Sequence, residues 1–416
     1  MANLKARHII AEIRRALLDN YVIIVDGPHG LELESLALEV TRNKYHLLDF
    51  RNEELREIAL KNPRAFVRSL PPYVIMKEVY LAPEVLFELG ELVYYLRIKH
   101  EGFIQNAFIV IQHLDTEKIG FKSQMHSISY LTFHITPFYS AEIVPYGDIN
   151  FLHNLFHQKH YPQIIKNNYD LRELMQRCTF PEILRKKSID KDEFFKNIIR
   201  SAAGLFSDKP EEFNNISEAL SILALNIGKL YNDNILPSKS QINEMQLFAL
   251  SKKAAATGLY IPLEQWSPLH DKSEQHMIHL VDTELVLFAR GETKIDDTNY
   301  NLLLRNFIVS EIYKQTKTYG TYKLYHFQLY KECPIDYVVE NLMNNHIISI
   351  SVEMNHHIGE DTIAKVKRFQ NHCSSFLKKN VIIYLGDKVI KITPDIIALP
   401  IASLWYSGGI GQWPTS

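Results

Sequence analysis

The stretch VIIVDGPHGLELES, residues 22–35, constrains the fold more than any other part of the sequence. An apolar run typical of a buried strand reaches Gly27-Pro28, turns, and enters a segment with helical spacing. Further apolar strands and amphipathic helices alternate up to about residue 140. Because parallel strands need a crossover connection, usually a helix, this order predicts a parallel, doubly wound sheet.

The composition sets wide bounds on the rest of the chain. With 416 residues, 46% of them hydrophobic, we expect two to four domains with real cores. The net charge of −2 argues against a protein that coats DNA or an anionic membrane. Cys178, Cys333 and Cys373 lie far apart, which favours a reducing compartment and excludes a disulfide framework or a cysteine-based zinc site.

No segment predicts export or membrane insertion. The first twenty residues are charged throughout and lack the apolar region of a signal peptide. No apolar run approaches the ~18 residues that a spanning helix needs. We therefore expect a soluble, cytoplasmic protein without membrane contact, and the frequent Asn, Ile, Lys and Tyr are compatible with a bacterial source.

The sequence changes character twice after the first sheet. Residues 149–291 read as helices with polar connections, and residues 292–416 as a second α/β unit with a mixed sheet. We accordingly predict three parts, with residues 1–148 as the first.

The order of these segments resembles one family, the prokaryotic AAA-type P-loop ATPases with a winged-helix segment and a C-terminal restriction-endonuclease-like domain. The resemblance rests on several blocks together rather than on one diagnostic motif. These blocks are the turn at Val22–Pro28, LDFRNEELREIALKNPRAFVRSLPP, Phe180-Pro181-Glu182, HLVDTELVLFARG, and ALPIASLW at residues 398–405.

The resemblance implies a nucleotide loop of the form GxxxxGK[ST]. There, glycines let backbone N–H groups surround the phosphates, lysine reaches the β and γ oxygens, and a hydroxyl holds Mg²⁺. Gly27 is kept, but Glu32 replaces the second glycine, Leu33 the lysine and Glu34 the hydroxyl residue. Two carboxylates beside a triphosphate are unfavourable, by about 4 kcal/mol per close like-charge pair at an effective dielectric near 20.

Two further strands depart from the family pattern. The strand PYVIMKEVYLAP has Lys77 where the resemblance implies the Mg²⁺-binding aspartate, while Glu78 remains at the water-polarising position. The strand AFIVIQHL has Ile111, Gln112 and His113 where relatives read roughly Thr-Gly-Ser. These departures predict a site that cannot hydrolyse ATP.

Two observations extend this prediction. No arginine occurs between Arg97 and Arg172, so the arginine that the family places before the following strand is absent. We also hypothesise that Lys77 pairs with Glu32 or Glu34 and fills the space of a Mg-nucleotide.

The C-terminal domain repeats the pattern. The resemblance implies Glu-x-Asp on one strand and Glu-x-Lys on the next, to hold a divalent metal and a lysine near the attacking water. Pro334 replaces the first acid and Asp336 is kept. On the next strand, Ser351 stands at the glutamate position and Glu353 at the lysine position. With the register shifted by two, Glu353 stands at the glutamate position and Asn355 at the lysine position. Either alignment lacks the lysine.

Arg305 stands where the family has a glutamate in the preceding helix, although Glu311 is kept further along. Asp336 and Glu353 remain weak metal-ligand candidates. The simpler expectation is that both are solvated carboxylates at strand ends.

Histidines offer a weaker set of metal candidates. His153, His157 and His160 fall on one face if residues 153–160 are helical, but no carboxylate has HExxH placement. A polar helix face is the favoured interpretation. The pairs His356-His357 and His372-Cys373 are weaker still.

The winged-helix resemblance gives little support for DNA binding. Its expected recognition region, SQINEMQLFALSKKA, has only Lys252 and Lys253 as cations, whereas recognition helices carry several basic and amide side chains. A helical bridge between domains is favoured.

Together these patterns predict a member of the ATPase family that has lost both active sites and acts as a non-hydrolysing scaffold or protein-interaction protein. We expect protein partners and no cofactor. The alternatives are an ATPase that binds ATP and Mg²⁺ through different contacts, and a DNA-binding or nuclease-related defence protein.

Overall fold

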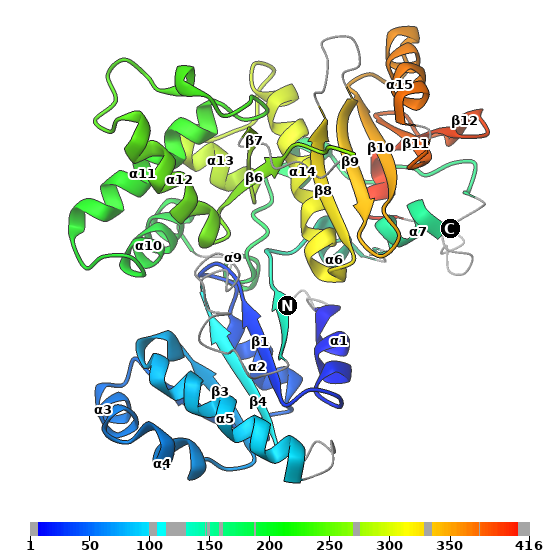
Figure 1. Ribbon diagram of the computed structural model, residues 1–416. Coiled ribbons are helices and arrows are strands. Elements are labelled where there is room, and N and C mark those ends of the chain that lie inside the picture. The colour runs from blue at the N-terminus through cyan, green and yellow to red at the C-terminus, as the bar shows by residue number, and fades with distance from the viewer. Residues whose placement is uncertain are drawn as a thin grey trace.

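The computed structural model describes residues 7–99, 106–113, 130–145, 147, 150–157, 161–186, 189–268, 275–327, 335–373 and 375–406. Figure 1 shows an N-terminal α/β part, a mostly helical middle part and a C-terminal part with a second sheet. Within these residues no helix is both long and apolar enough to cross a lipid bilayer.

The N-terminal part contains the predicted parallel sheet. Its strand order is β2-β3-β4-β1-β5, and every neighbouring pair is parallel. Helices separate β1, β2, β3 and β4 along the chain, so the prediction of a parallel α/β sheet is confirmed. The strands are β1 (Val22–Asp26), β2 (His46–Asp49), β3 (Tyr73–Lys77), β4 (Ala107–Gln112) and β5 (Tyr130–His134), and the helices are α1 (Ile9–Ala16), α2 (Leu33–Val40), α3 (Glu53–Lys61), α4 (Pro63–Arg68), α5 (Pro83–Lys99) and α6 (Ser140–Ile143).

Local sequence explains several boundaries in this part. Asn62 ends α3, and its side chain accepts a hydrogen bond from Ala65 N–H, which caps α4. Pro63 is the first residue of α4, where its missing N–H has no helical partner to lose. The central strands β1 and β4 are buried along their whole length, which explains their unbroken apolar runs.

The middle part is built from helices and one small antiparallel sheet. A β6–β7 pair follows three longer helices, an order compatible with the winged-helix prediction, which stays a prediction. Residues 161–165 and 387–389 exchange backbone hydrogen bonds, so the start of this part lies against the C-terminal sheet. The elements are α7 (Phe151–His157), α8 (Leu171–Met175), α9 (Pro181–Arg185), α10 (Lys191–Gly204), α11 (Pro210–Leu225), α12 (Glu244–Ala256), β6 (Tyr260–Glu264), β7 (His276–Leu280) and α13 (Thr283–Arg290).

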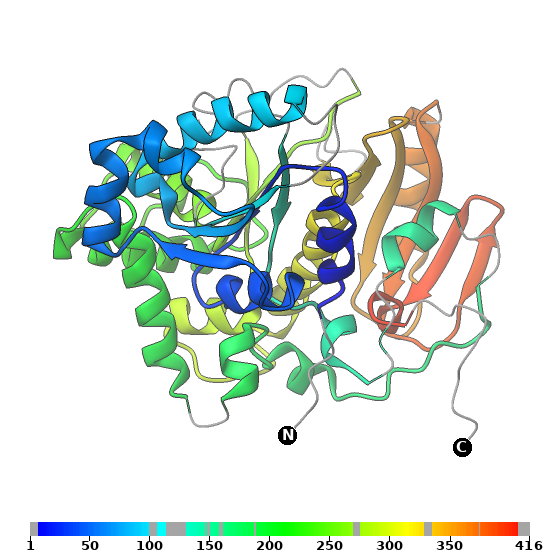
Figure 2. The same cartoon turned by 90° about the horizontal axis from the view of Figure 1, so that it is seen from below.

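The C-terminal part has the predicted mixed sheet, in the order β12-β13-β11-β10-β9-β8. The pairs β10–β11 and β11–β13 are parallel, and the other three pairs are antiparallel. Figure 2 shows this sheet beside the N-terminal part, with α14 between the two. The elements are α14 (Tyr300–Tyr319), β8 (Tyr322–Phe327), β9 (Ile335–Asn341), β10 (His346–Glu353), α15 (Glu360–Cys373), β11 (Leu377–Tyr384), β12 (Ile390–Thr393) and β13 (Ile396–Pro400).

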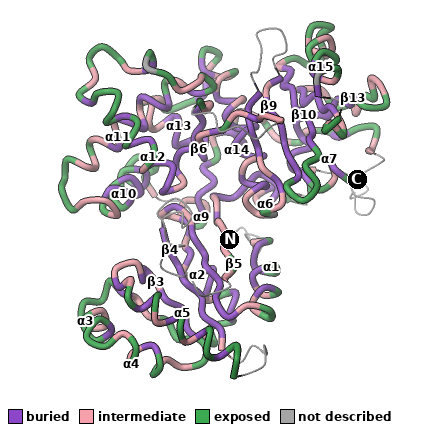
Figure 3. Tube along the Cα trace, viewed as in Figure 1, coloured by how far each residue is buried: buried purple, intermediate pink, exposed green. Residues whose placement is uncertain are grey.

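One hydrophobic core runs through all three parts. A single cluster of buried side chains begins at Ile9 and ends at Trp405. Figure 3 shows buried residues in the N-terminal sheet and along α14. A second cluster lies on the opposite face of the N-terminal sheet, under α3, α4 and α5.

Buried polar contacts join the parts at α14. Lys314 donates hydrogen bonds to the carbonyl of Phe138 and to the hydroxyl of Thr179, at 3.1 Å each. The N–H and hydroxyl of Thr179 in turn donate to Asp282. Glu311 accepts from the N–H of Ser140 at 2.7 Å, and burial raises its pKa to about 7. Glu311 is therefore part of the junction between the N-terminal part and α14.

Candidate functional site

The predicted nucleotide-site residues meet at the carboxyl edge of the N-terminal sheet. In open α/β sheets this edge is where ligands bind. The loop at residues 27–32 joins β1 to α2, Glu34 lies in the first turn of α2, and Lys77 ends β3. Leu33, at the position of the family's lysine, is buried in the hydrophobic core.

The loop has a tightly fixed backbone. A Cβ atom on Gly27 would lie 2.4 Å from the carbonyl oxygen of Ile135, so only glycine fits there. Gly30 has φ +85° and packs against Phe194 and Ile198 of α10. Glu32 has φ 52°, the left-handed region that non-glycine residues seldom adopt. The loop is thus held between the sheet and the helical middle part.

A lysine occupies the centre of an acidic cluster beside the loop. The Nζ atom of Lys77 lies 2.7 Å from the Glu34 carboxylate and 3.6 Å from that of Asp49. The Lys77 side chain is only 12% exposed. Arg51 holds Asp49 from the other side at 2.6 Å. Although burial acts in the opposite direction, hydrogen bonds from Arg51 and the charge of Lys77 lower the pKa of Asp49.

The second loop carboxylate has a different cation. Glu32 pairs with Arg185, the last residue of α9, at 2.6 Å. Of the two hypothesised pairs, Lys77–Glu34 is therefore present, and Glu32 binds Arg185 instead of Lys77. The sequence analysis missed Arg185 because it lies about 150 positions after the loop; only its place just after the Phe180-Pro181-Glu182 block was a signal.

A buried Glu–His–His group lies under the loop. Glu78 is 2% exposed, has φ 56°, and approaches Nε2 of His113 at 3.3 Å. Nδ1 of His113 is 3.1 Å from the carbonyl oxygen of Gly27, and its ring stacks on His29 with centroids 3.9 Å apart. Burial raises the pKa of Glu78 to about 7 and lowers those of His113 to about 4 and of His29 to about 3.

Near neutral pH both imidazoles are therefore uncharged, and the Glu78–His113 contact is not an ion pair. A hydrogen bond from His113 to the carbonyl of Gly27 and the stacking of the two rings hold the group together. Within the described residues, no set of three or more His, Cys, Asp or Glu side chains has the arrangement of a metal site.

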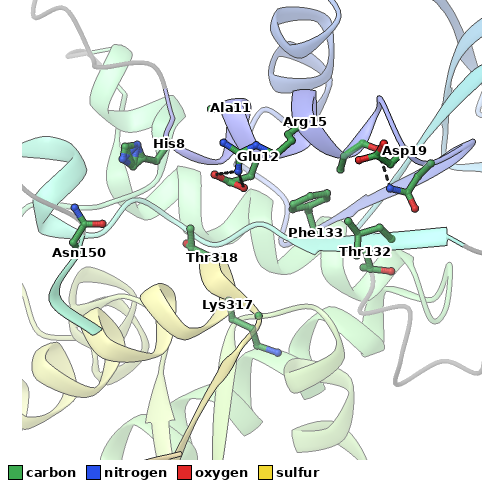
Figure 4. Close-up of a pocket in the computed structure, with 14 residues that line it drawn as sticks. His8, Ala11, Glu12, Arg15, Asp19, Thr132, Phe133, Asn150, Lys317 and Thr318 are labelled. Atoms are coloured by element: carbon green, nitrogen blue, oxygen red, sulfur yellow. Dashed lines mark hydrogen bonds and ion pairs between the residues drawn. The ribbon is translucent and has the colours of Figure 1, made fainter. Parts of the chain in front are cut away.

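Hollows beside the sheet offer no better site. Figure 4 shows one of about 630 Å³ between α1, β5 and the end of α14, lined by residues that the sequence analysis did not predict. Glu12 and Arg15 on its wall neutralise each other at 2.9 Å. A much smaller hollow, of about 40 Å³, lies next to the Asp26–His134 contact of 2.6 Å.

The C-terminal candidates also meet at one strand edge. Asp336 on β9 pairs with Arg305 of α14 at 2.7 Å and accepts a hydrogen bond from Val352 N–H at 2.9 Å. Arg305 thus holds the acid that the resemblance assigns to a metal. Ser351 lies on β10 and is buried. Pro334 lies outside the described residues.

The expectation of a simply solvated carboxylate is wrong for Glu353, which is only 9% exposed, whereas Asp336 stays partly exposed beside Arg305. Glu353 accepts hydrogen bonds from the hydroxyl of Thr362 at 2.8 Å and from Asn355 at 2.7 Å. It also accepts one from Gly359 N–H, at the start of α15. Although burial acts in the opposite direction, these hydrogen bonds lower the pKa of Glu353. The carboxylate therefore anchors the first turn of α15.

The remaining candidates are surface features. His153 and His157 lie exposed on α7 with ring centroids 4.5 Å apart, and His160 lies outside the described residues. His356 and His357 are exposed. Cys373 is buried at the end of α15, and the side chain of His372 lies outside the description.

The expected recognition helix, α12, presents few charges. Lys253 pairs with Glu212 of α11, and Lys252 lies over the ring of Phe248, 4.0 Å from its centroid. Met245, 85% exposed, lies on the outer side of the helix. This apolar face differs from the basic and amide face that DNA recognition uses.

Comparisons with known proteins give a family match and two similar structures. A family model described as "Domain of unknown function (DUF4143)" matches residues 302–404, from α14 to the chain after β13. The Walker-type ATPase PABY2304 of Pyrococcus abyssi is 12% identical, with a TM-score of 0.39 over 69% of this chain and 96% of that chain. Protein VC1899 from Vibrio cholerae is 10% identical, with a TM-score of 0.20 over 92% of this chain and 95% of that chain. No curated protein matches the sequence.

Proposed function

We propose that this protein is a non-hydrolysing scaffold or protein-interaction protein that keeps the form of a P-loop ATPase without its chemistry. The observation that carries the proposal is the position of Lys77. Lys77 stands at the position where the resemblance places the Mg²⁺-binding aspartate. Its ammonium group lies 2.7 Å from the carboxylate of Glu34. A fixed positive charge there opposes a divalent cation and has no carboxylate to offer it.

The loop itself does not fit a Mg-nucleotide. A triphosphate would bring negative charge next to Glu32 and Glu34, and each close like-charge pair is unfavourable by about 4 kcal/mol at an effective dielectric near 20. Binding would also require the phosphates to displace the partners that these carboxylates already have, Arg185 and Lys77.

The C-terminal site supports the same conclusion. Arg305 neutralises Asp336, and Glu353 is engaged by the start of α15. A metal-dependent nuclease needs free acids and a lysine near the attacking water. Neither acid is free here, so we expect no metal-dependent cleavage of DNA.

The decisive experiment is thermal unfolding with Mg-ATP, Mg-ADP and Mg²⁺ alone, together with ATPase and duplex-cleavage assays. A ligand at 100 times its Kd adds about 2.7 kcal/mol, which shifts the midpoint by a few degrees. We expect no shift and no turnover.

Two variants identify the results that would contradict the proposal. ATP turnover that disappears in Glu78→Gln, or DNA cleavage that disappears in Asp336→Asn, would overturn the proposal. A midpoint shift with Mg-ATP but no turnover would overturn only the argument about the loop and leave a nucleotide-binding scaffold.

A further inference from the structure

Helix α5 exposes an apolar face that nothing in the described structure covers. The inner side of the helix is buried in the second core cluster. Its outer side carries large side chains that are more than half exposed: Phe87 56%, Tyr94 55%, Tyr95 58% and Ile98 63%. Figures 1 and 2 place α5 on the side of the N-terminal part that faces away from the C-terminal sheet.

The spacing of these side chains makes them one stripe. Phe87, Tyr94 and Ile98 are separated by seven and four positions, which places them on the same side of an α-helix. The exposed Glu91 lies on the same side, between Phe87 and Tyr94, so the stripe is apolar at both ends and carries one carboxylate near its middle. Scattered single apolar residues on a surface need no explanation, whereas several on one helix face mark an interaction site. The stripe runs along most of the 17-residue helix, about 25 Å in length.

The charges along α5 are divided between its two ends. Glu84, Glu88 and Glu91 lie in the first half, and Arg97 and Lys99 lie in the last turn. This distribution is self-complementary when two such helices run antiparallel, because the acidic half of each then faces the basic end of the other.

We propose that α5 is a dimer interface that binds α5 of a second copy of this chain in the antiparallel direction. A twofold axis near residues 92 and 93 sets Phe87 against Ile98 of the second copy and Glu88 against Lys99. Tyr94 of each copy then comes near Glu91 of the other, within reach of its hydroxyl group. Antiparallel helix dipoles add to the attraction.

The size of this interface sets the expected affinity. One helix pair buries less than the roughly 1,200 Å² of a standard stable interface, so we expect a dimer with a Kd in the micromolar range. The proposal is independent of whether the loop at residues 27–32 binds nucleotide, since α5 covers a different face of the sheet.

Sedimentation equilibrium of the full chain, between about 1 and 200 µM, tests the interface. We expect a monomer–dimer equilibrium in the wild type and a dissociation constant raised about tenfold or more in Ile98→Glu, which places a charge in the apolar stripe. Met245→Glu, at an 85% exposed position on α12, is the matched control and should dimerise like the wild type.

Charge exchange separates this geometry from a general surface effect. Glu88→Lys and Lys99→Glu each place like charges opposite one another and should weaken the dimer about threefold, while the double variant restores it. All of these positions lie on the surface, so circular dichroism should be unchanged. A wild type that stays monomeric at the highest concentration, or a dimer that Ile98→Glu does not weaken, overturns the proposal.

Discussion

The two candidate sites each pair a cation with an acid, but they differ in the burial and the backbone conformation around the pair. At the N-terminal sheet, Lys77 is 12% exposed and lies beside the buried Glu78–His113 contact. At the C-terminal sheet, Arg305 and Asp336 are 38% and 28% exposed. In both places a cation pairs with an acid, but beside the first pair Glu32 and Glu78 have left-handed backbone conformations.

The difference indicates how strongly each pair is tied to the rest of the fold. Glu32 and Glu78 keep left-handed backbone conformations that are unfavourable by about 1–3 kcal/mol each unless the surroundings impose them. The Arg305–Asp336 pair has no such neighbours and resembles a surface ion pair, which typically contributes about 0–1 kcal/mol. We therefore expect substitutions in the loop region to affect the whole fold, and those at Arg305 to remain local.

Substitution of Gly27 should give the largest loss of stability. Gly27→Ala would place a Cβ atom 2.4 Å from a backbone oxygen, and we expect a loss of about 3 kcal/mol in the free energy of unfolding. Gly204→Ala is the matched control, because Gly204 is the exposed last residue of α10 and no neighbouring side chain or distant backbone lies within 4 Å of its Cβ position. Denaturant unfolding of both variants measures the effect. Equal stability of the two would show that the loop is looser than its contacts indicate.

Lys77 tests the electrostatic half of the comparison. Lys77→Asp would bring a third carboxylate to Glu34 and Asp49, and we expect a loss of about 2–3 kcal/mol. Lys77→Met, which keeps the apolar stem, should lose less. Because three carboxylates attract a divalent cation, millimolar Mg²⁺ should restabilise the Asp variant and leave the wild type unchanged. Thermal unfolding of Lys77→Asp at the wild-type midpoint would disprove the role of the ion pair.

The raised pKa of Glu78 predicts that the stability of the protein depends on pH. Its pKa of about 7 lies above the ordinary value of 4.5, so the native state binds the proton more tightly between these values. Stability from this group is present below pH 4.5 and is lost as the pH rises to 7. The Glu78→Gln variant cannot lose stability in this way, because glutamine does not ionise. The difference in the free energy of unfolding between this variant and the wild type should therefore grow by about 2 kcal/mol between pH 5 and pH 8. Midpoints measured across this range would contradict the interpretation if the two curves stay parallel.

Arg305 should give the smallest effect. Arg305→Ala removes a partly exposed pair, and we expect a change below about 1 kcal/mol in the free energy of unfolding, reduced further by 1 M salt. A loss as large as that of Lys77→Asp would remove the distinction between the two sites. Denaturant titration at two salt concentrations is sufficient.

The sequence predicted the elements well where apolar spacing alone decides them. The buried runs at Val22–Asp26 and Ala107–Gln112 admit only central strands, and both strands form as expected. The pairing of Lys77 with Glu34 was also predictable, because the start of a crossover helix and the ends of parallel strands lie at the same edge of the sheet.

The other features of the candidate sites could not be predicted, because they depend on tertiary contacts that sequence patterns do not indicate. Arg185 reaches Glu32 only because the middle part folds back over the loop. The expectation that Glu353 is solvated was wrong for a local reason. The hydroxyl of Thr362 and the N–H of Gly359, at the start of α15, both donate hydrogen bonds to its carboxylate. No periodicity indicates a side chain that caps a helix from the preceding strand.

The hydrophobic cluster that begins at Ile9 and ends at Trp405 has a consequence for how such a chain can change over time. A protein whose domains have separate cores can lose or exchange one of them by recombination. Here a cut near residue 148 or 291 would divide one core and expose buried faces on both fragments. We therefore expect fragments cut at these positions to be less stable than the same regions in the full chain.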